Sequence, residues 1–457
     1  MNRPGTAIEF PRGETRLYYS IFLALLLAYF ISGLLLPVLG ENGSRAQETL
    51  FGLSQLSYLG IPCFLIGLSI PLAVLIARPR ISSGSMEKMR GWAVRTFNSS
   101  WFRVGFSILL VAVFFLLRNR FINYDGSMFA EKFAQDVPLH GAHVTHDEMW
   151  ELYLHSRFWF YTNRLFGWSV ELSYQVLSSV AGGAFILLLM QYCTVMFPER
   201  PILAFVICVS GGYMQLFFGD VENYTLTTTL IMAYFLASAL YIRGRWSIIT
   251  PSVILAAALT FHLLAGFLIP SILILYDIAW RRGEKWSVMI AAATFCAIIG
   301  LTLLFFQFND LPIRNLWYNS HAFGFGGHIR QWLVDPSPGY YFKILNLAFL
   351  LAPVWIMLIP QLLFGRIKLD ELNIHLIIAA AFMGIFFIGW KATLGVYSDW
   401  NMFAAAALPF TFLVLRNMLS TDCIRRRCWL VYLFAWLFVL HSYSWVISNH
   451  FYNMAAT

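Results

Sequence analysis

Residues 286–306 read WSVMIAAATFCAIIGLTLLFF and contain no charged side chain. An α-helix needs about 20 consecutive apolar residues to cross the hydrocarbon core of a bilayer. The run is preceded by Arg281, Arg282 and Lys285 and followed by Asp310. An apolar run of this length between a basic and an acidic flank predicts a membrane-spanning helix.

Similar apolar runs recur along nearly the whole chain. The sequence is 59% hydrophobic and only 12% charged, with a mean hydropathy of +0.67, whereas about a quarter of the residues of a soluble domain are charged. We therefore expect an all-α, polytopic membrane protein with about 13 spans. The predicted spans are 17–39, 52–77, 101–117, 172–196, 201–217, 224–242, 247–261, 263–280, 286–306, 343–363, 373–390, 401–416 and 428–447. Around His262 the pattern also fits a single span with a re-entrant hairpin.

Charge alternates between successive connections. The basic ones share one face: Arg78 to Arg95, Arg243 and Arg245, Arg281 to Lys285, Arg366 and Lys368, and Arg425 to Arg427. Because basic loops stay in the cytoplasm, the N-terminus is predicted to be cytoplasmic. The acids then fall in outer loops, the longest of which are 118–171 and 307–342. The amphipathic, aromatic-rich pattern in the first of these predicts helices that lie in the membrane interface.

Several protein classes are disfavoured. The apolar stretch at 17–39 is too long for a signal-peptide core, so we expect it to be retained as a span. The six cysteines have no CxxC spacing, which argues against a disulfide framework or a zinc site. The net charge of +8 is spread over inner loops, so no nucleic-acid partner is expected.

The first outer loop carries the first candidate site residues. Asp125 follows a span directly, where a carboxylate can meet a polar acceptor beside a lipid-borne donor; it also fits a helix N-cap. His146, Asp147 and Trp159 lie further along a stretch rich in histidine and aromatic residues, and we assign them to acceptor or sugar binding. The histidine spacing matches no defined metal site.

A second acidic pair lies in the short turn of residues 217–225, which reads FFGDVENYT. A turn needs only residues such as Gly and Asn, whereas Asp220 and Glu222 are ionisable. Ionisable groups at membrane depth usually mark function. Paired carboxylates suit a divalent cation such as Mg²⁺ or Mn²⁺, or the hydroxyls of a sugar.

Basic residues gather in later outer segments. Arg and His near a glycine-rich run suit a phosphate group; the candidates are Arg314, His321, His328, Arg330 and Lys391. Asp399, in a short outer loop, and His262, which interrupts an apolar stretch, are further candidates for acceptor or sugar binding.

The layout resembles the GT-C superfamily of membrane glycosyltransferases, which use polyprenyl-phosphate sugars. The resemblance rests on YDGSMF at 124–129, DVE at 220–222, the His262 segment and YSDWNMF at 397–403, and covers about 101–416. It implies a catalytic module at 101–416, preceded by an N-terminal part (1–100) with two added spans and followed by a last span with an outer C-terminus (417–457). The acidic loop follows the third span rather than the first, and Gly126 stands where many relatives have Glu.

The resemblance implies an inverting sugar transfer from a polyprenyl phosphate to a hydroxyl of a glycan, lipid or protein. Asp125 is then expected to act as general base, with Asp220 and Glu222 orienting the acceptor, assisting the base or holding a cation. The short loops throughout the chain favour a bacterial plasma membrane, and the distribution of Lys and Arg puts the acidic site on the periplasmic or extracellular face.

Two other functions fit parts of the sequence. A polymerase or ligase of lipid-linked glycans would work through Arg and His of the 307–342 loop. A transporter of lipid-linked sugars would usually show repeated halves and intramembrane charges, whereas we find no repeat and little charge near the midplane.

Overall fold

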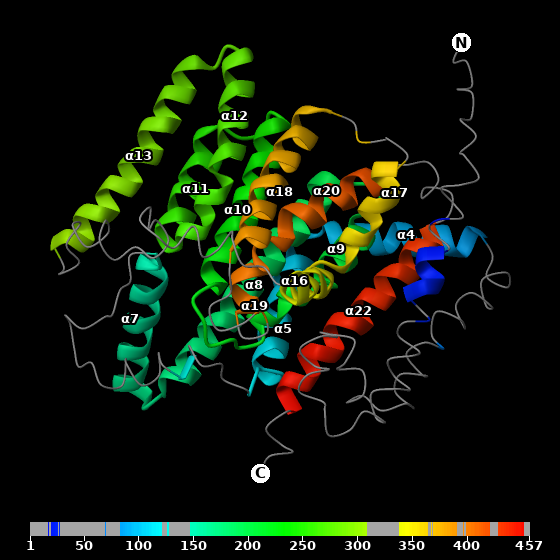
Figure 1. Ribbon diagram of the computed structural model, residues 1–457, viewed down its shortest axis with the longest axis horizontal. Coiled ribbons are helices and arrows are strands. Elements are labelled where there is room, and N and C mark those ends of the chain that lie inside the picture. The colour runs from blue at the N-terminus through cyan, green and yellow to red at the C-terminus, as the bar shows by residue number, and fades with distance from the viewer. Residues whose placement is uncertain are drawn as a thin grey trace.

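The computed structural model describes residues 17, 20–25, 27, 69, 83–120, 126–127, 147–308, 338–363, 367, 369–390, 396, 399–420 and 428–451. Every element of regular secondary structure assigned within these ranges is a helix (Figure 1). In the first part of the chain they are α4 (Ser83–Asn98), α5 (Ser100–Leu116), α7 (Met149–Phe166), α8 (Val170–Met196), α9 (Pro201–Val209), η4 (Gly212–Phe217) and α10 (Thr225–Ile242). The later elements are α11 (Ile249–Phe261), η5 (Leu263–Leu268), α12 (Ile269–Arg281), α13 (Lys285–Phe308), α16 (Pro338–Leu351), η7 (Pro353–Met357), α17 (Leu358–Leu363), α18 (Glu371–Gly389), α19 (Trp400–Ala404), α20 (Ala407–Ser420) and α22 (Cys428–Phe451).

The apolar helices confirm a multi-pass membrane protein. Six described helices are long and apolar enough to cross a bilayer, or up to eight if two bent pairs each form one span. The predicted count of 13 is not settled by these ranges, since the predicted spans 17–39 and 52–77 lie almost entirely outside them. The helix α13 is the run quoted above, and only 11% of its most apolar window is buried inside the protein, as expected for a lipid-facing helix.

The core of the bundle is built around α8 and α10. These two helices pack against each other, α5 covers α8, and α11 separates α10 from α13. On the other side α18 packs against α12 and α20. The close contact of α5 and α8 depends on Gly183, because a Cβ atom there would collide with the side chain of Val111 on α5.

The chain is not continuously helical in the predicted span 201–217 or around His262. The segment 201–217 divides into α9 and η4, and α11 has 13 residues, which is only about 20 Å at 1.5 Å per residue. At His262 the backbone is extended, and η5 and α12 lead away as a separate helical segment. The structure therefore has two helical passages at His262, one of the two arrangements that the sequence left open.

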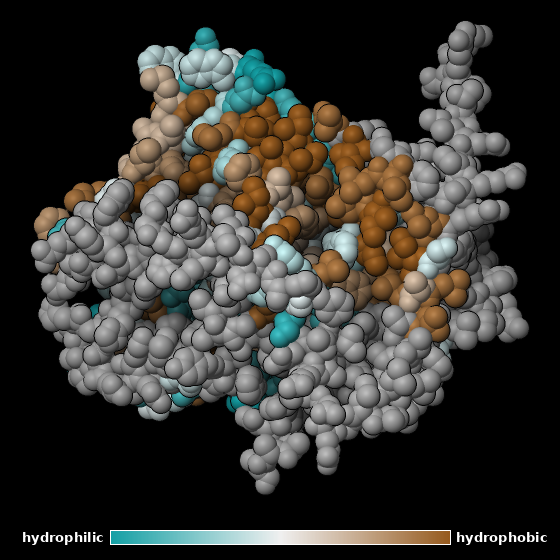
Figure 2. Space-filling view, viewed as in Figure 1, coloured by the Kyte–Doolittle hydropathy of each residue, from teal (hydrophilic) through white to brown (hydrophobic). Residues whose placement is uncertain are grey.

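The connections gather at two ends of the bundle. At one end, which we call the basic end, Arg282 contacts the Ile242 carbonyl and the Glu371 carboxylate. Arg243, Arg245, Arg281 and Lys285 lie in the same connections. Figure 2 shows a hydrophilic tip at this end, above a broad apolar surface, and Figure 1 places the turn between α12 and α13 there. The opposite end carries most of the buried carboxylates, and we call it the carboxylate end.

Candidate functional site

The connection between η4 and α10 places two carboxylates inside the protein. Asp220 is only 2% exposed and Glu222 only 3%. The turn begins at Gly219, whose φ of +68° favours glycine and whose α-carbon lies against Arg118. A side chain at this position would be strained and would also collide with Arg118. The backbone conformation at Gly219 therefore fixes the position of the Asp220 α-carbon.

Burial has a large effect on Asp220. Removal from water raises the pKa of its carboxyl from 3.8 to about 7, although the nearby amide side chains of Asn401 and Asn119 favour the ionised form. Its Oδ2 atom has no hydrogen-bond partner among the described residues. A carboxyl with a pKa near 7 and an open oxygen can exchange a proton with a bound hydroxyl near neutral pH.

The segment that follows α5 is held against this turn. The Asn119 amide donates a hydrogen bond to the Phe218 carbonyl (2.6 Å), and Gln175 of α8 donates its side-chain amide to the Asn119 carbonyl (3.0 Å). The guanidinium of Arg118 donates to Gln175 in turn (3.0 Å). These contacts fix the chain just before Asp125, which follows Arg120 by five residues and lies outside the described residues.

A carboxylate–histidine pair lies at the same end. His262 Nε2 is 3.4 Å from Glu148 Oε1, and both side chains are mostly buried. His262 Nδ1 accepts the Leu264 amide hydrogen (3.0 Å), so the ring proton of the neutral form is on Nε2 and faces Glu148. Burial raises the pKa of Glu148, and His262 partly offsets this. Burial lowers the pKa of His262, but the hydrogen bond and charge of Glu148 outweigh it and raise the pKa.

Asn223 and Tyr224 connect this pair to the turn. The Asn223 amide donates to Glu148 Oε2 (3.0 Å), and its oxygen accepts from the Tyr174 hydroxyl (3.1 Å). The Tyr224 ring lies 4.9 Å from that of His262.

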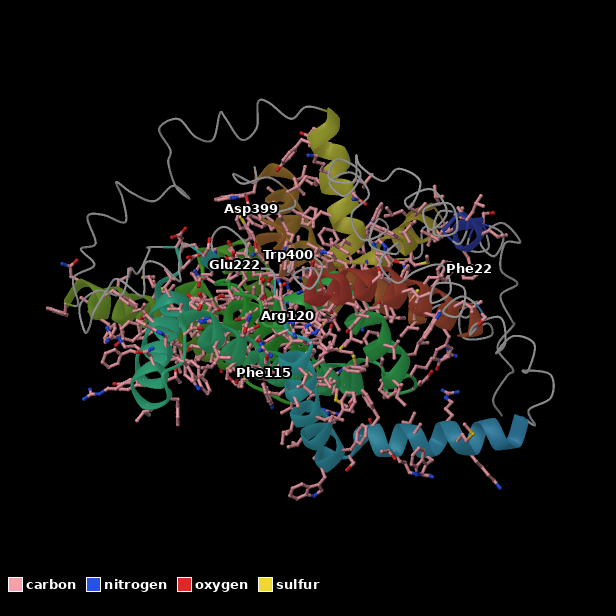
Figure 3. All side chains as sticks on the ribbon, turned by 90° about the horizontal axis from the view of Figure 1, so that it is seen from below. Phe22, Phe115, Arg120, Glu222, Asp399 and Trp400 are labelled. Atoms are coloured by element: carbon pink, nitrogen blue, oxygen red, sulfur yellow. The ribbon has the colours of Figure 1, made fainter. Side chains whose placement is uncertain are left out.

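Tyr224 also marks where the acids converge. Burial raises the pKa of Tyr224 well above its usual value, and the negative charges of Glu148, Glu222, Asp147 and Asp399 raise it further. Asp399 comes from a distant part of the chain, and Figure 3 shows Glu222 and Asp399 reaching the same region, beside Trp400. The site therefore combines carboxylates from the segment before α7, the 218–224 turn and the start of α19.

Glu151 of α7 secures the 218–224 turn from the other side. It is fully buried, and it accepts hydrogen bonds from the amides of Leu226 and Thr227 (2.9 Å each) and from the Thr227 hydroxyl (2.7 Å). Thr227 lies in the first turn of α10, where free amides and the helix dipole favour a negative charge. His155, one turn further along α7, lies 3.7 Å from Glu151 and stacks on Tyr174.

The structure brings together five of the predicted site residues. These are Asp147, Asp220, Glu222, His262 and Asp399. Trp159 packs nearby, against the apolar group of Leu152, Val170, Tyr174 and Val221. The other predicted site residues lie outside the described residues: Asp125, His146, Arg314, His321, His328, Arg330 and Lys391.

Some residues of this site were not among the predicted ones. Glu148 and Glu151 stand in the acidic outer segment, but nothing in their spacing distinguishes them from solvated acids. Asn119 and Asn401 carry no sequence signal beyond their positions at the ends of apolar runs. Asn223 and Tyr224 lie inside the FFGDVENYT stretch quoted above. Their position directly after the paired acids Asp220 and Glu222 is the sequence feature that could have indicated them.

A divalent metal ion in a protein is usually held by several oxygen or nitrogen ligands. No group of three or more His, Cys, Asp or Glu side chains in the described ranges could hold one. A cation at Asp220 and Glu222 would therefore need ligands from elsewhere in the chain or from the substrate, and it stays a prediction.

The fold is similar to that of a polytopic membrane glycosyltransferase of known structure. No family model and no curated protein sequence matches this chain. Two solved structures are similar, both of ArnT from Cupriavidus metallidurans, a GT-C glycosyltransferase. The structure bound to undecaprenyl phosphate has a TM-score of 0.54 at 11% identity, covering 80% of this chain and 79% of that one. The apo structure has a TM-score of 0.51 at 12% identity, covering 76% and 77%. At such identities the likeness establishes the fold alone.

Proposed function

We propose that the protein is a membrane glycosyltransferase that uses a polyprenyl-phosphate-linked sugar as donor. The observation that carries the proposal is the GT-C fold over most of the chain, with buried carboxylates from separate connections gathered at one end. The Asp220 carboxyl, whose pKa is raised to about 7 and whose Oδ2 has no hydrogen-bond partner among the described residues, suits proton exchange with an acceptor hydroxyl.

The reaction is an inverting transfer. A hydroxyl oxygen of the acceptor attacks the anomeric carbon of the sugar, and the bond from that carbon to the phosphate oxygen breaks. The lipid phosphate leaves with the bonding electron pair, and the hydroxyl proton passes to a carboxylate. We assign this base role to Asp125, which follows the hydrogen-bonded segment 118–120 in the chain. Loss of such a base costs about 10²–10⁴ in rate.

The described carboxylates then bind the acceptor. Asp220, with its open oxygen, and Glu222 accept hydrogen bonds from sugar hydroxyls or assist Asp125 in taking the proton. Asp147, His262 and Asp399 line the same region and extend the contact with the acceptor or sugar. His146 and Trp159 belong to the same acceptor-binding set in this proposal.

The leaving phosphate requires stabilisation of its charge. We assign this role to Arg314, His321, His328, Arg330 and Lys391, because cationic side chains aimed at developing negative charge lower the barrier. The undecaprenyl phosphate seen with ArnT supports a donor lipid of this kind. Mg²⁺ or Mn²⁺ at Asp220 and Glu222 is an optional addition that metal removal would test.

The proposed setting is a bacterial plasma membrane. With the basic end in the cytoplasm, as the distribution of Lys and Arg favours, the carboxylate end faces the periplasm or the outside. The acceptor is then a glycan, lipid or protein hydroxyl on that face.

A transfer assay tests the proposal. Purified protein in nanodiscs would be given a panel of radiolabelled undecaprenyl-phosphate sugars together with envelope glycan and lipid acceptors. We expect transfer by the wild type, a fall of 10²–10⁴ for Asp125→Asn, and a smaller fall for Asp220→Asn. Asp277→Asn is the matched control, because Asp277 is half-exposed and pairs with Arg281 near the basic end. An active Asp125→Asn variant would remove the base assignment.

A further inference from the structure

The sequence between the second predicted span and α5 forms a helix that the proposed chemistry does not use. The helix α4 ends at Asn98, the backbone at Ser99 is extended, and α5 begins at Ser100. The axes of Lys88–Asn98 and Ser100–Leu116 differ by 77°. Figure 3 shows α4 extending sideways from the end of α5. Since α5 packs along the apolar helix α8, α4 runs across the direction of these helices rather than along it.

One face of α4 is attached to the protein at its basic end. Phe97 is buried and packs edge-on against Phe205 of α9, with ring centroids 5.6 Å apart. Arg90 donates a hydrogen bond to the Glu199 carbonyl (2.8 Å) in the connection between α8 and α9. These contacts fix the orientation of α4 against α9 and the connection between α8 and α9.

The opposite face combines positive charge with a large aromatic side chain. Lys88 and Arg95 are exposed, and neither pairs with a carboxylate in the part of the chain that the structure describes. Trp92 lies between them on the helix surface and is 65% exposed, and Trp101, at the start of α5, is 88% exposed. Trp is favoured at the level of the lipid headgroups, and Lys and Arg beside it attract anionic lipids.

We propose that α4 binds the anionic phospholipid headgroups of the leaflet at the basic end. Lys88 and Arg95 contact the phosphates, and Trp92 inserts among the headgroups. The charge supports this occupant: α4 carries one acidic residue, Glu87, against Lys88, Arg90 and Arg95. The inference does not depend on the reaction at the carboxylate end, so it can fail or stand separately from the proposed function.

Lipid titration of the full-length protein tests the proposal. Delipidated protein in detergent would be titrated with dioleoyl phosphatidylglycerol or dioleoyl phosphatidylcholine, and bound lipid counted by native mass spectrometry. At about 1 kcal/mol per basic side chain near an anionic surface, Lys88→Gln/Arg95→Gln should weaken the tightest phosphatidylglycerol binding by about 30-fold. Arg243→Gln/Arg245→Gln is the matched control, since it removes two exposed charges from another connection at the same end.

Hydrogen exchange provides a local reading. In nanodiscs, replacing phosphatidylcholine by phosphatidylglycerol should slow exchange of the 88–98 amides in the wild type and not in the double variant. The charge-conserving Lys88→Arg/Arg95→Lys variant should retain the protection, and unchanged exchange in α8 and α10 shows that each variant is folded. The proposal is overturned if phosphatidylcholine binds as tightly, if the control variant loses as much affinity, or if the 88–98 amides do not respond to lipid charge.

Discussion

The buried carboxyl of Asp220 makes the stability of the folded chain depend on pH. Its pKa is raised from 3.8 to about 7 by burial, so between these values the folded protein holds a proton that the unfolded chain releases. The free energy of unfolding therefore falls as pH rises from about 4 through about 7, and levels off above that. A shift of about three units at about 1.36 kcal/mol each corresponds to about 4 kcal/mol as an upper value.

The variant Asp220→Asn isolates this effect. An amide keeps the shape of the protonated carboxyl and cannot ionise, so the variant should lose this part of the pH dependence. Between pH 5 and pH 8.5 the wild type should lose about 3 kcal/mol more than the variant. At pH 8.5 the variant should be the more stable protein, even though it is expected to transfer sugar more slowly.

Thermal unfolding in detergent, followed by tryptophan fluorescence at the two pH values, measures the difference. Asp277→Asn serves as control, because it makes the same substitution at a carboxyl that is half-exposed rather than buried. If the melting temperatures of wild type and Asp220→Asn change in parallel with pH, the carboxyl binds protons equally in the folded and unfolded states, and burial does not raise its pKa.

Three further changes have expected outcomes. Glu151→Gln leaves at least one amide or hydroxyl of the first turn of α10 without its acceptor and should cost about 1–3 kcal/mol, measured as faster hydrogen exchange of that turn. His262→Gln should destabilise the protein more at pH 6 than at pH 9, because the raised pKa of His262 gives a contribution that is lost as pH rises through the folded value; equal melting shifts at both pH values would contradict this. Gly183→Ala should cost about 1–3 kcal/mol by overpacking α5 against α8, whereas Gly300→Ala, with open space around it, should be neutral or stabilising in the same melting assay.

The long helices could be predicted from sequence because each is an apolar run of sufficient length. The run 286–306 reappears inside α13, and 373–390 inside α18, with ends that differ by a few residues. The division of 201–217 into α9 and η4 could not be predicted, since it depends on packing against neighbouring helices rather than on hydropathy. The helix α4 was interpreted only as a basic loop, because its apolar face is narrow.

The candidate site was predictable where acids stand out against an apolar background. Asp220, Glu222 and Asp399 each interrupt or adjoin a span, so their convergence followed from the sidedness of the loops. Glu151 and Asn119 were not predictable as site residues, because their roles depend on tertiary contacts with the first turn of α10 and with Phe218. Local sequence carries no signal for such long-range hydrogen bonds.

The stoichiometry of the reaction distinguishes sugar transfer from lipid transport. Wild-type protein in nanodiscs would receive an acceptor and an undecaprenyl-phosphate sugar labelled separately in its lipid and in its sugar. The released lipid phosphate and the glycosylated acceptor would then be quantified in the same sample. We expect one undecaprenyl phosphate to be released for each sugar transferred, with inverted configuration at the anomeric carbon. Intact donor appearing on the opposite leaflet, with no sugar on the acceptor, would contradict it and identify a transporter.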